Sequence, residues 1–230
     1  MVHVELPLAA SAHTTGTYDR ILDVAERLFA ERGIARTSIR NITDQAHVNV
    51  AAVNYHFKSK VQLVHKVVER RFIDLESARS QALDEVQARC RREARAPETP
   101  ELVDALMEPI FRHAETGDAG WLNFLNFVSR LAWEPGAEEY SPPSTSLEIF
   151  ERFDDMLKQA IPALAHDKAR RSWRIAFMRA ATQQTLLMIA AVRSGRTPNA
   201  MAFVSDLNKL STEEIKHELI AFVAAGLAAK

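Results

Sequence analysis

The chain has 230 residues and carries 29 Lys or Arg against 30 Asp or Glu, which leaves a formal net charge of -1. This balance excludes a polybasic tail or an acidic disordered chain as a description of the whole molecule. With 47% hydrophobic residues and only 7 Gly and 9 Pro, the sequence predicts a folded, helix-rich protein of one large or two unequal domains.

Cysteine content and apolar runs indicate the compartment. The single cysteine, Cys90, cannot form a disulfide within the chain and offers no metal-binding spacing. The longest apolar run, residues 219–229, has 11 residues, which is short of the roughly 18 needed for a membrane span. We therefore expect a cytoplasmic protein without a transmembrane helix, cofactor or metal, and a flexible tail over residues 1–16.

Short helices are expected near the N-terminus. Apolar residues spaced on one helix face predict a first helix over residues 17–33. Thr37 and Ser38 can cap a second helix, and Asn49 can cap a third over about residues 50–56. Because only three residues separate the second and third helices, the pattern is that of a helix-turn-helix.

A long helix is expected next. Ser59 and Gln62 fit a capping box, and no Gly or Pro occurs from there to Ala96. The helix is either roughly 35 residues long or kinked, and it links two domains. Later Pro and Gly residues divide the rest into four or five helices without a strand pattern. We expect an all-α fold, with a helix-turn-helix three-helix domain over residues 17–62 and a larger effector-binding and dimerisation domain over residues 63–230.

The last two helices carry clear start signals. Asp167 can cap a helix that reaches residue 194, and Ser211 with Glu214 forms a capping box that opens a helix through about residue 227. In this last helix an apolar stripe lies beside small residues that allow close helix approach. Packing within one chain and a symmetric dimer interface formed by the last two helices satisfy the pattern equally well.

Residues 20–63 resemble the DNA-binding domain of the TetR family of bacterial repressors. The resemblance covers about 45 residues, and it is carried by Arg20-Ile21-Leu22, Ala25, Leu28-Phe29, Gly33, Thr37-Ser38-Ile39, Ile42, Ala46, Val53, Tyr55-His56-Phe57, Ser59-Lys60 and Leu63. The family usually has Gly in the turn between the second and third helices, where this chain has His47. A positive φ at that turn is tolerable for His but less favourable than for Gly.

Charge is divided unequally along the chain. Through Arg71 there are 10 Lys or Arg against 7 Asp or Glu, a difference of +3; after it there are 19 against 23, a difference of -4. Positive charge on the N-terminal part suits contact with phosphates, although a solvated helix face can carry as much without binding DNA.

The expected DNA contacts lie on the second and third helices and at the start of the fourth. Asn54 can bond bidentately to adenine, and the small apolar residues before it can touch thymine methyls, which predicts weak readout biased toward A·T pairs and aided by DNA shape. The resemblance implies phosphate contacts from Tyr55, His56 and Lys60, whereas Arg40 fits a phosphate, a base edge or plain solvent. The candidate set is Thr37, Ser38, Arg40, Asn49, Val50, Ala51, Ala52, Asn54, Tyr55, His56 and Lys60.

For the larger domain, the resemblance implies a homodimer that binds a small effector. Residues 121–133 are apolar nearly all round, which predicts a central buried helix with one polar stripe. That stripe needs either a ligand with a polar or anionic head, or protein partners such as Glu108, Asp118 or Gln183. The candidate ligand-binding residues are Met107, Phe111, Trp121, Asn123, Phe124, Asn126, Phe127, Arg130, Trp173, Phe177 and Gln184.

The sequence therefore predicts a ligand-responsive transcriptional regulator, most simply a repressor, that binds a palindromic double-stranded operator as a homodimer. A small apolar or amphipathic effector, such as a fatty acid, acyl thioester or aromatic compound, releases it through the helix after Ser59. The alternatives are a helical-bundle enzyme and a protein-interaction module without DNA binding. Glu214 and His217 match one Glu-x-x-His element of a di-iron site, but only one such element occurs.

Overall fold

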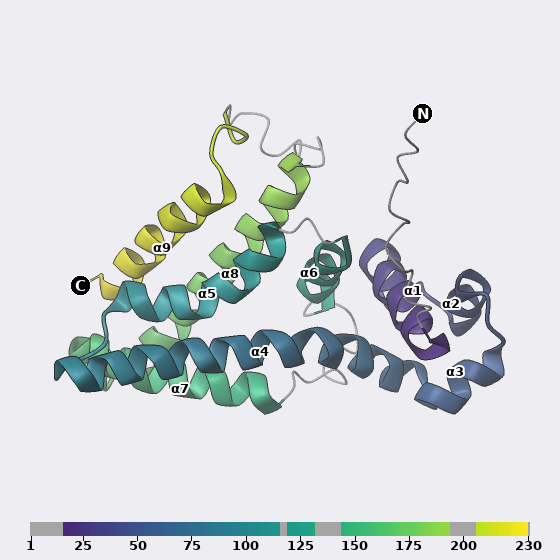
Figure 1. Ribbon diagram of the computed structural model, residues 1–230, viewed down its shortest axis with the longest axis horizontal. Helices are drawn as coiled ribbons and strands as arrows, with labels where there is room; N and C mark the ends of the chain where they lie inside the picture. Colours follow the sequence, from purple (N-terminus) through teal and green to yellow (C-terminus); the bar gives the residue numbers. More distant parts are fainter. Residues whose placement is uncertain (1–15, 116–118, 132–143, 194–205, 230) are drawn as a thin grey trace, which may run out of the picture.

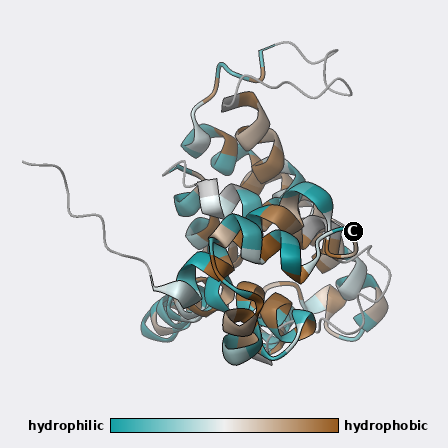
Figure 2. Cartoon of the chain, turned by 90° about the vertical axis from the view of Figure 1, so that its right-hand side faces the viewer, coloured by the Kyte–Doolittle hydropathy of each residue, from teal (hydrophilic) through white to brown (hydrophobic). Residues whose placement is uncertain are grey.

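The fold is described from a computed structural model of the chain, over residues 16–115, 119–131, 144–193 and 206–229. These residues form α-helices and one 3-10 turn, Pro162–Leu164, and contain no β-strand. The all-α expectation is therefore confirmed for the part of the chain that the structure describes. Figure 2 shows hydrophobic and hydrophilic residues side by side along the helices, as expected of helices that bury one face.

Three helices form a small N-terminal bundle, which we call the head: α1 (Thr17–Arg32), α2 (Ile39–Ala46) and α3 (Val50–Phe57). Two caps place α2 and α3 where the sequence predicted them. The Ser38 hydroxyl accepts from the Asn41 amide at 3.1 Å while the Asn41 side chain accepts from the Ser38 amide at 2.9 Å, and Asn49 Oδ1 accepts from the Ala52 amide at 2.8 Å. Each cap satisfies backbone donors that the first helical turn leaves free.

His47 closes the turn between α2 and α3. Its φ of 53° and ψ of 48° lie in the left-handed region, and its amide donates to the Thr43 carbonyl. A residue with a Cβ pays roughly 1 kcal/mol for this conformation, which His tolerates better than most residues. The helix-turn-helix geometry is thus kept without the glycine that is usual at this position.

One continuous helix, α4 (Lys60–Glu93), has 34 residues and runs from the head along the whole larger domain (Figure 1). This decides between the long and the kinked helix that the sequence allowed. The capping box expected at its start is only half formed. The Ser59 hydroxyl accepts from the Gln62 amide at 3.2 Å, but the Ser59 amide donates to the Phe57 carbonyl at 2.6 Å, so the Gln62 side chain has no donor to accept from.

The larger domain adds five described helices around α4: α5 (Thr99–Glu115), α6 (Ala119–Leu131), α7 (Ser144–Ala160), α8 (Lys168–Arg193) and α9 (Thr212–Ala228). In Figure 1, α7 runs beside α4, α8 and α9 lie on the other side of it, and α6 stands next to α1 of the head. The predicted caps at Asp167 and Ser211 are both present, with the reciprocal bonds of a full capping box at Ser211.

Helix α8 is the most apolar long helix of the described residues that meets a measure for membrane spans. Its residues Lys168–Val192 are long and apolar enough, with a mean hydropathy of 1.3 in the most apolar window, to meet the length and composition of a membrane span. The sequence prediction of no membrane span was based on uninterrupted apolar runs, a stricter measure that α8 does not meet. Core and interface helices of water-soluble proteins meet the same measure, so it is weak evidence for a membrane. Only 17% of that window is buried within the single chain.

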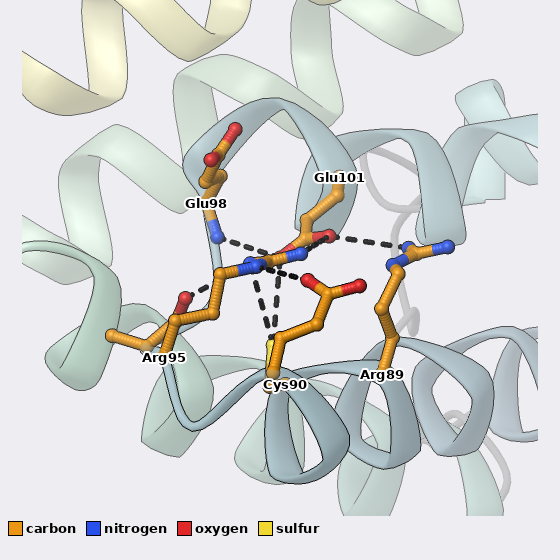
Figure 3. Close-up of polar contacts among 7 residues, drawn as sticks. Arg89, Cys90, Arg95, Glu98 and Glu101 are labelled. Carbon is orange, nitrogen blue, oxygen red and sulfur yellow. Dashed lines mark hydrogen bonds and ion pairs between the residues drawn. The ribbon is translucent and has the colours of Figure 1, made fainter.

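A cluster of charges fixes the corner between α4 and α5 (Figure 3). Glu101 accepts hydrogen bonds from both terminal nitrogens of Arg95, at 2.7 and 3.1 Å, and from the backbone amide of Glu98 at 2.7 Å. The Arg95 guanidinium is the main reason that the pKa of Glu101 is lowered to about 2. Burial and the neighbouring Glu101 raise the pKa of the Cys90 thiol, which therefore stays protonated at neutral pH.

We predict that Glu101→Gln flattens the loss of stability in acid. The folded pKa of Glu101 is about 2 and its ordinary value is 4.5, so its contribution is complete above the ordinary value and disappears as the pH falls toward 2. Urea unfolding between about pH 5 and pH 2 measures the slope. Glu98→Gln keeps the backbone amide that bonds to Glu101 and serves as the control with the wild-type slope. Equal slopes for wild type and Glu101→Gln would contradict the assignment.

Candidate functional site

Helix α3 presents one face to solvent and buries the other. Val53 and Phe57 are 1% and 2% exposed, and Phe57 stacks on the Tyr18 ring with a centroid distance of 4.9 Å. Tyr55 on the opposite face is 83% exposed, although no packing need explains so large an aromatic ring in solvent. The predicted contact residues that share this exposure, in full or in part, are Val50, Ala51, Ala52, Asn54, Tyr55 and His56.

The DNA contacts predicted at the helix starts differ in how far they are exposed to solvent. Ser38 and Asn49 are exposed, and their side chains cap α2 and α3. Thr37 is fully buried, and its hydroxyl donates to the Gly33 carbonyl at 2.8 Å. Including Thr37 among the DNA contacts was therefore wrong, because its side chain packs inside the head. A threonine before a helix has the same sequence signal whether its hydroxyl faces in or out.

Two cationic candidates flank α3. Arg40 is exposed on α2. Lys60 is half-buried at the start of α4, where its ammonium donates to the Ile34 carbonyl at 2.5 Å. This bond holds the start of α4 against the loop that precedes α2, so Lys60 positions the head in addition to carrying a charge.

A buried carboxylate joins the head to α4. Glu26 of α1 is 2% exposed and accepts from Arg71 at 2.9 and 3.0 Å and from Arg70 at 2.9 Å. Arg70 also donates to Asp23 at 2.7 Å. The sequence reasoning missed this cluster, although a signal existed: Glu26 lies at helical spacing between Leu22 and Phe29, on the apolar face of α1.

Aromatic contacts continue from this cluster into the larger domain. The Arg71 guanidinium lies 5.6 Å from the ring centroid of Trp121 in α6, and Trp121 stacks on His113 of α5 at 3.9 Å. Phe127, also in α6, lies 5.6 Å from Phe29 of α1 between ring centroids. Trp121 and Phe127 therefore connect α6 to its neighbours, whereas the sequence prediction gave both to a ligand site.

An apolar cavity of about 150 Å³ lies among helices α4 to α8. Its polar side chains come mostly from α4 and α8. Arg79 of α4 is 9% exposed and donates to Glu76 at 3.1 Å and to the Leu106 carbonyl at 3.0 Å. Burial lowers the pKa of Arg79 despite the Glu76 carboxylate. The cavity is lined by Phe72, Leu75, Arg79, Leu106, Met107, Ile110, Phe124, Leu125, Val128, Ser146, Leu147, Phe150, Met178, Arg179, Thr182, Gln183 and Leu186.

Only Met107 and Phe124 among the predicted ligand residues line this cavity. Helix α6 turns Phe124, Leu125 and Val128 toward it, which leaves Asn123 half-buried and Asn126 exposed elsewhere. The other predicted residues lie away from this cavity: Phe111 is buried in the core, and Trp173, Phe177 and Gln184 are exposed on α8. The side chain of Arg130 lies outside the described part of the structure.

Helices α8 and α9 form a second apolar surface. Trp173 and Phe177 of α8 are 66% and 62% exposed, and Phe222 of α9 is 72% exposed. A groove of about 620 Å³ between the two helices includes Phe222, Met188 and Ile189. The other face of α9, with Leu219, Val223 and Leu227, is buried within the chain. The last helix therefore packs within the chain on one face, as one of the two expected arrangements requires. Its other face stays exposed to solvent.

The Glu-x-x-His element of α9 has a structural explanation. Glu214 bonds to Ser211 in the capping box, and His217 lies 3.2 Å from Glu213 on an exposed face. Over the described residues, no three His, Cys, Asp or Glu side chains are grouped so as to hold a metal ion.

Two family models match the chain. Residues 21–67 match bacterial regulatory proteins of the tetR family, and residues 104–226 match the tetracyclin repressor-like C-terminal domain, which alone spans more than half of the chain. The chain belongs to the TetR family. The members of this family are regulators and not enzymes, which confirms the corresponding prediction.

Relatives of this TetR-family chain are similar to it over short segments. It is 41% identical over 56 residues to the HTH-type transcriptional repressor KstR2 of Mycolicibacterium smegmatis, over 24% of this chain and 27% of that protein. It is 42% identical over 52 residues to the probable HTH-type transcriptional regulator YttP of Bacillus subtilis, over 23% and 25%. The aligned segment spans about a quarter of each relative.

Solved structures share the whole fold. A TetR-like transcriptional regulator from Rhodococcus sp. RHA1 superimposes with a TM-score of 0.57 at 15% identity, over 98% of this chain and 100% of that one. The ketosteroid transcriptional regulator KstR2 of Mycobacterium tuberculosis superimposes with a TM-score of 0.52 at 18% identity, over 94% and 97%. At these identities the likeness concerns the fold alone.

Proposed function

We propose that this TetR-family chain is a cytoplasmic transcriptional repressor that binds an operator through α3 as a homodimer and leaves it when a small effector binds. The observation that carries the proposal is the outward face of α3, where Asn54 and Tyr55 are exposed on a helix whose other face anchors the head. An exposed aromatic and amide on a capped second helix of a helix-turn-helix suit contact with base edges and phosphates.

We expect Asn54→Ala to change which DNA sequences are preferred, and Lys60→Ala to weaken binding to all sequences. The exposed Asn54 amide can bond to adenine, whereas Lys60 offers a positive charge to a phosphate and also holds the loop before α2. Losing one phosphate contact lowers the slope of log affinity against log salt by about one. A binding-site selection and a salt titration measure the two effects.

The control for both variants is Gln62→Ala, which removes an exposed side-chain amide in the first turn of α4 that makes no cap bond. It should leave the binding-site profile and the salt slope unchanged. An unaltered profile for Asn54→Ala would remove that residue from base reading, and an unaltered slope would remove Lys60 from the phosphate contacts.

The homodimer is supported by the open apolar face of α8 and α9. Trp173, Phe177 and Phe222 expose large rings that a second copy would bury around a two-fold axis. Such an axis would match a palindromic operator. Sedimentation equilibrium tests this directly: the expected mass is twice 25.8 kDa, and a monomer at all concentrations contradicts it.

The effector site of the proposal is the cavity among helices α4 to α8. Apolar walls with a few polar groups fit a small apolar or amphipathic molecule, the class that includes fatty acids, acyl thioesters and aromatic compounds. The steroid named for one structural neighbour is a property of that protein, and a cavity of about 150 Å³ is small for four fused rings.

A continuous set of contacts supports coupling between the cavity and the head. Phe72 and Phe124 line the cavity with their ring centroids 5.5 Å apart, and Phe124 lies 5.5 Å from Trp121. Trp121 lies under Arg71, which holds Glu26 of the head. An effector that binds better to a rearranged set of these rings would favour the conformation in which the heads do not fit the operator.

A further inference from the structure

The cavity among helices α4 to α8 carries more positive than negative charge. Arg79 and Arg179 both line it, and Glu76 beside them pairs with Arg79. The ring of Phe150 lies against both guanidiniums, 6.0 Å from Arg79 and 4.8 Å from Arg179 between ring centroid and guanidinium carbon. Within the described residues Arg179 forms no ion pair. Arg179 is an exposed residue, so its positive charge lies where the cavity meets solvent and is free to pair with an incoming anion.

Unused donors accompany this charge. Arg79 is more than nine-tenths buried, and its Nη2 donates to no group in the described part of the chain. Gln183 follows Arg179 by one helical turn on α8, so the two side chains share a face, and its amide likewise has no partner among the described residues. Arg79 Nη2 is not fully enclosed, so it can bond to water in the cavity, and a ligand carboxylate can take the place of that water.

The size of the cavity limits the body of the ligand. A volume of about 150 Å³ is that of an engineered protein cavity known to hold benzene. The aromatic and aliphatic walls, including Phe72, Phe124 and Met178, suit a flat apolar ring. A long acyl chain exceeds this volume and would have to extend out of the cavity.

We propose that the effector is a compact monocarboxylate with an apolar body about the size of one aromatic ring. Its carboxylate accepts from Arg179, Gln183 and the free nitrogen of Arg79, and its ring lies between Phe72 and Phe124. This inference rests on the proposed effector role of the cavity, and it narrows the class of ligand to anions of small size.

Calorimetric titration of the full chain with benzoate, benzamide and dodecanoate tests the proposal. Benzamide has the shape of benzoate without its charge, so we expect benzoate to bind about tenfold tighter or more, as a charge-assisted hydrogen bond implies. Dodecanoate keeps the charge on a longer body and should bind more weakly than benzoate. Equal binding of benzamide, tighter binding of dodecanoate, or no binding of benzoate to the folded protein each overturns the proposal.

Variants of α8 test whether Arg179 binds the carboxylate of the ligand. Arg179→Met should weaken benzoate binding about tenfold and leave benzamide binding within about twofold, and Arg179→Lys should restore part of the loss. Lys168→Met removes one charge from the same helix away from the cavity and should leave benzoate binding unchanged. If Lys168→Met and Arg179→Met have the same effect, the general field of the protein attracts the anion and the assigned site is wrong.

A gel-shift assay on the operator distinguishes a failure of this ligand assignment from a failure of the proposed repressor function. If benzamide binds and releases the DNA as well as benzoate does, the effector role stands and the carboxylate inference fails. If benzoate binds with the expected preference but the DNA stays bound, the ligand class stands and the repressor mechanism fails.

Discussion

Replacing Glu26 with Ala is expected to lower the free energy of unfolding by about 3 kcal/mol, near the lower end for breaking a buried ion pair, because both arginines keep some contact with solvent. Glu26 is 2% exposed and accepts all of its hydrogen bonds from Arg70 and Arg71. Without it, both arginines lose their shared carboxylate between α1 and α4, and Arg70 keeps only its bond to Asp23. Urea denaturation followed by circular dichroism measures the loss.

The matched control is Glu31→Ala, on the same helix. Glu31 is 48% exposed in its side chain and lies 3.8 Å from Arg27, so this exposed pair should contribute no more than about 0.5 kcal/mol. Similar losses for the two variants would show that Glu26 acts as an ordinary surface charge. In operator binding, Glu26→Ala should also reduce the response to effector, because the head is no longer held to α4 at that point.

Phe127→Ala is expected to cost about 4 kcal/mol of stability, the usual loss when a buried aromatic ring leaves a cavity. Phe127 is 1% exposed, and its ring packs against Phe29 in the interface between α6 and the head. A double-mutant cycle with Phe29→Ala should give a coupling energy of about 1 kcal/mol. The second substitution costs less than it does alone, because the first has already removed the contact between the two rings.

Phe153→Ala provides the comparison. Phe153 is fully buried in α7, and a similar single loss is expected, but its effect should add to that of Phe29→Ala within about 0.5 kcal/mol. An additive pair Phe29–Phe127 would contradict a direct contact between α6 and the head. The milder Phe127→Leu should fold, bind effector normally and show a smaller change of operator affinity on binding it.

The beginnings of helices were predictable because the signals are local. Ser38, Asn49, Asp167 and Ser211 each bond to a backbone amide within three residues, so residue type and spacing are sufficient. The exposed face of α3 followed from the same reasoning, since the apolar positions of a short helix define which side is buried.

The cavity was not predictable in this way, because its lining depends on how each helix is rotated about its own axis. Asn126 and Phe124 are two residues apart on an apolar helix, and only packing decides which of them faces the cavity. Arg79 and Arg179 are 100 positions apart and meet only through the fold. The burial of Thr37 is a third case, in which a hydroxyl has the same local pattern facing inward or outward.

The unbroken course of α4 has a mechanical consequence. From Arg79 at the cavity to Lys60 at the head there are 19 residues, which at 1.5 Å each make a stiff arm of about 28 Å. A tilt of about 10° at the cavity end would therefore swing the head by about 5 Å, a sizeable error against half-sites spaced about 34 Å apart. A displacement too small to disturb the cavity walls is thus magnified by the length of the helix alone. A glycine in the middle of α4 should therefore weaken the effect of the effector on operator affinity, while the cavity still binds effector and the head still binds DNA.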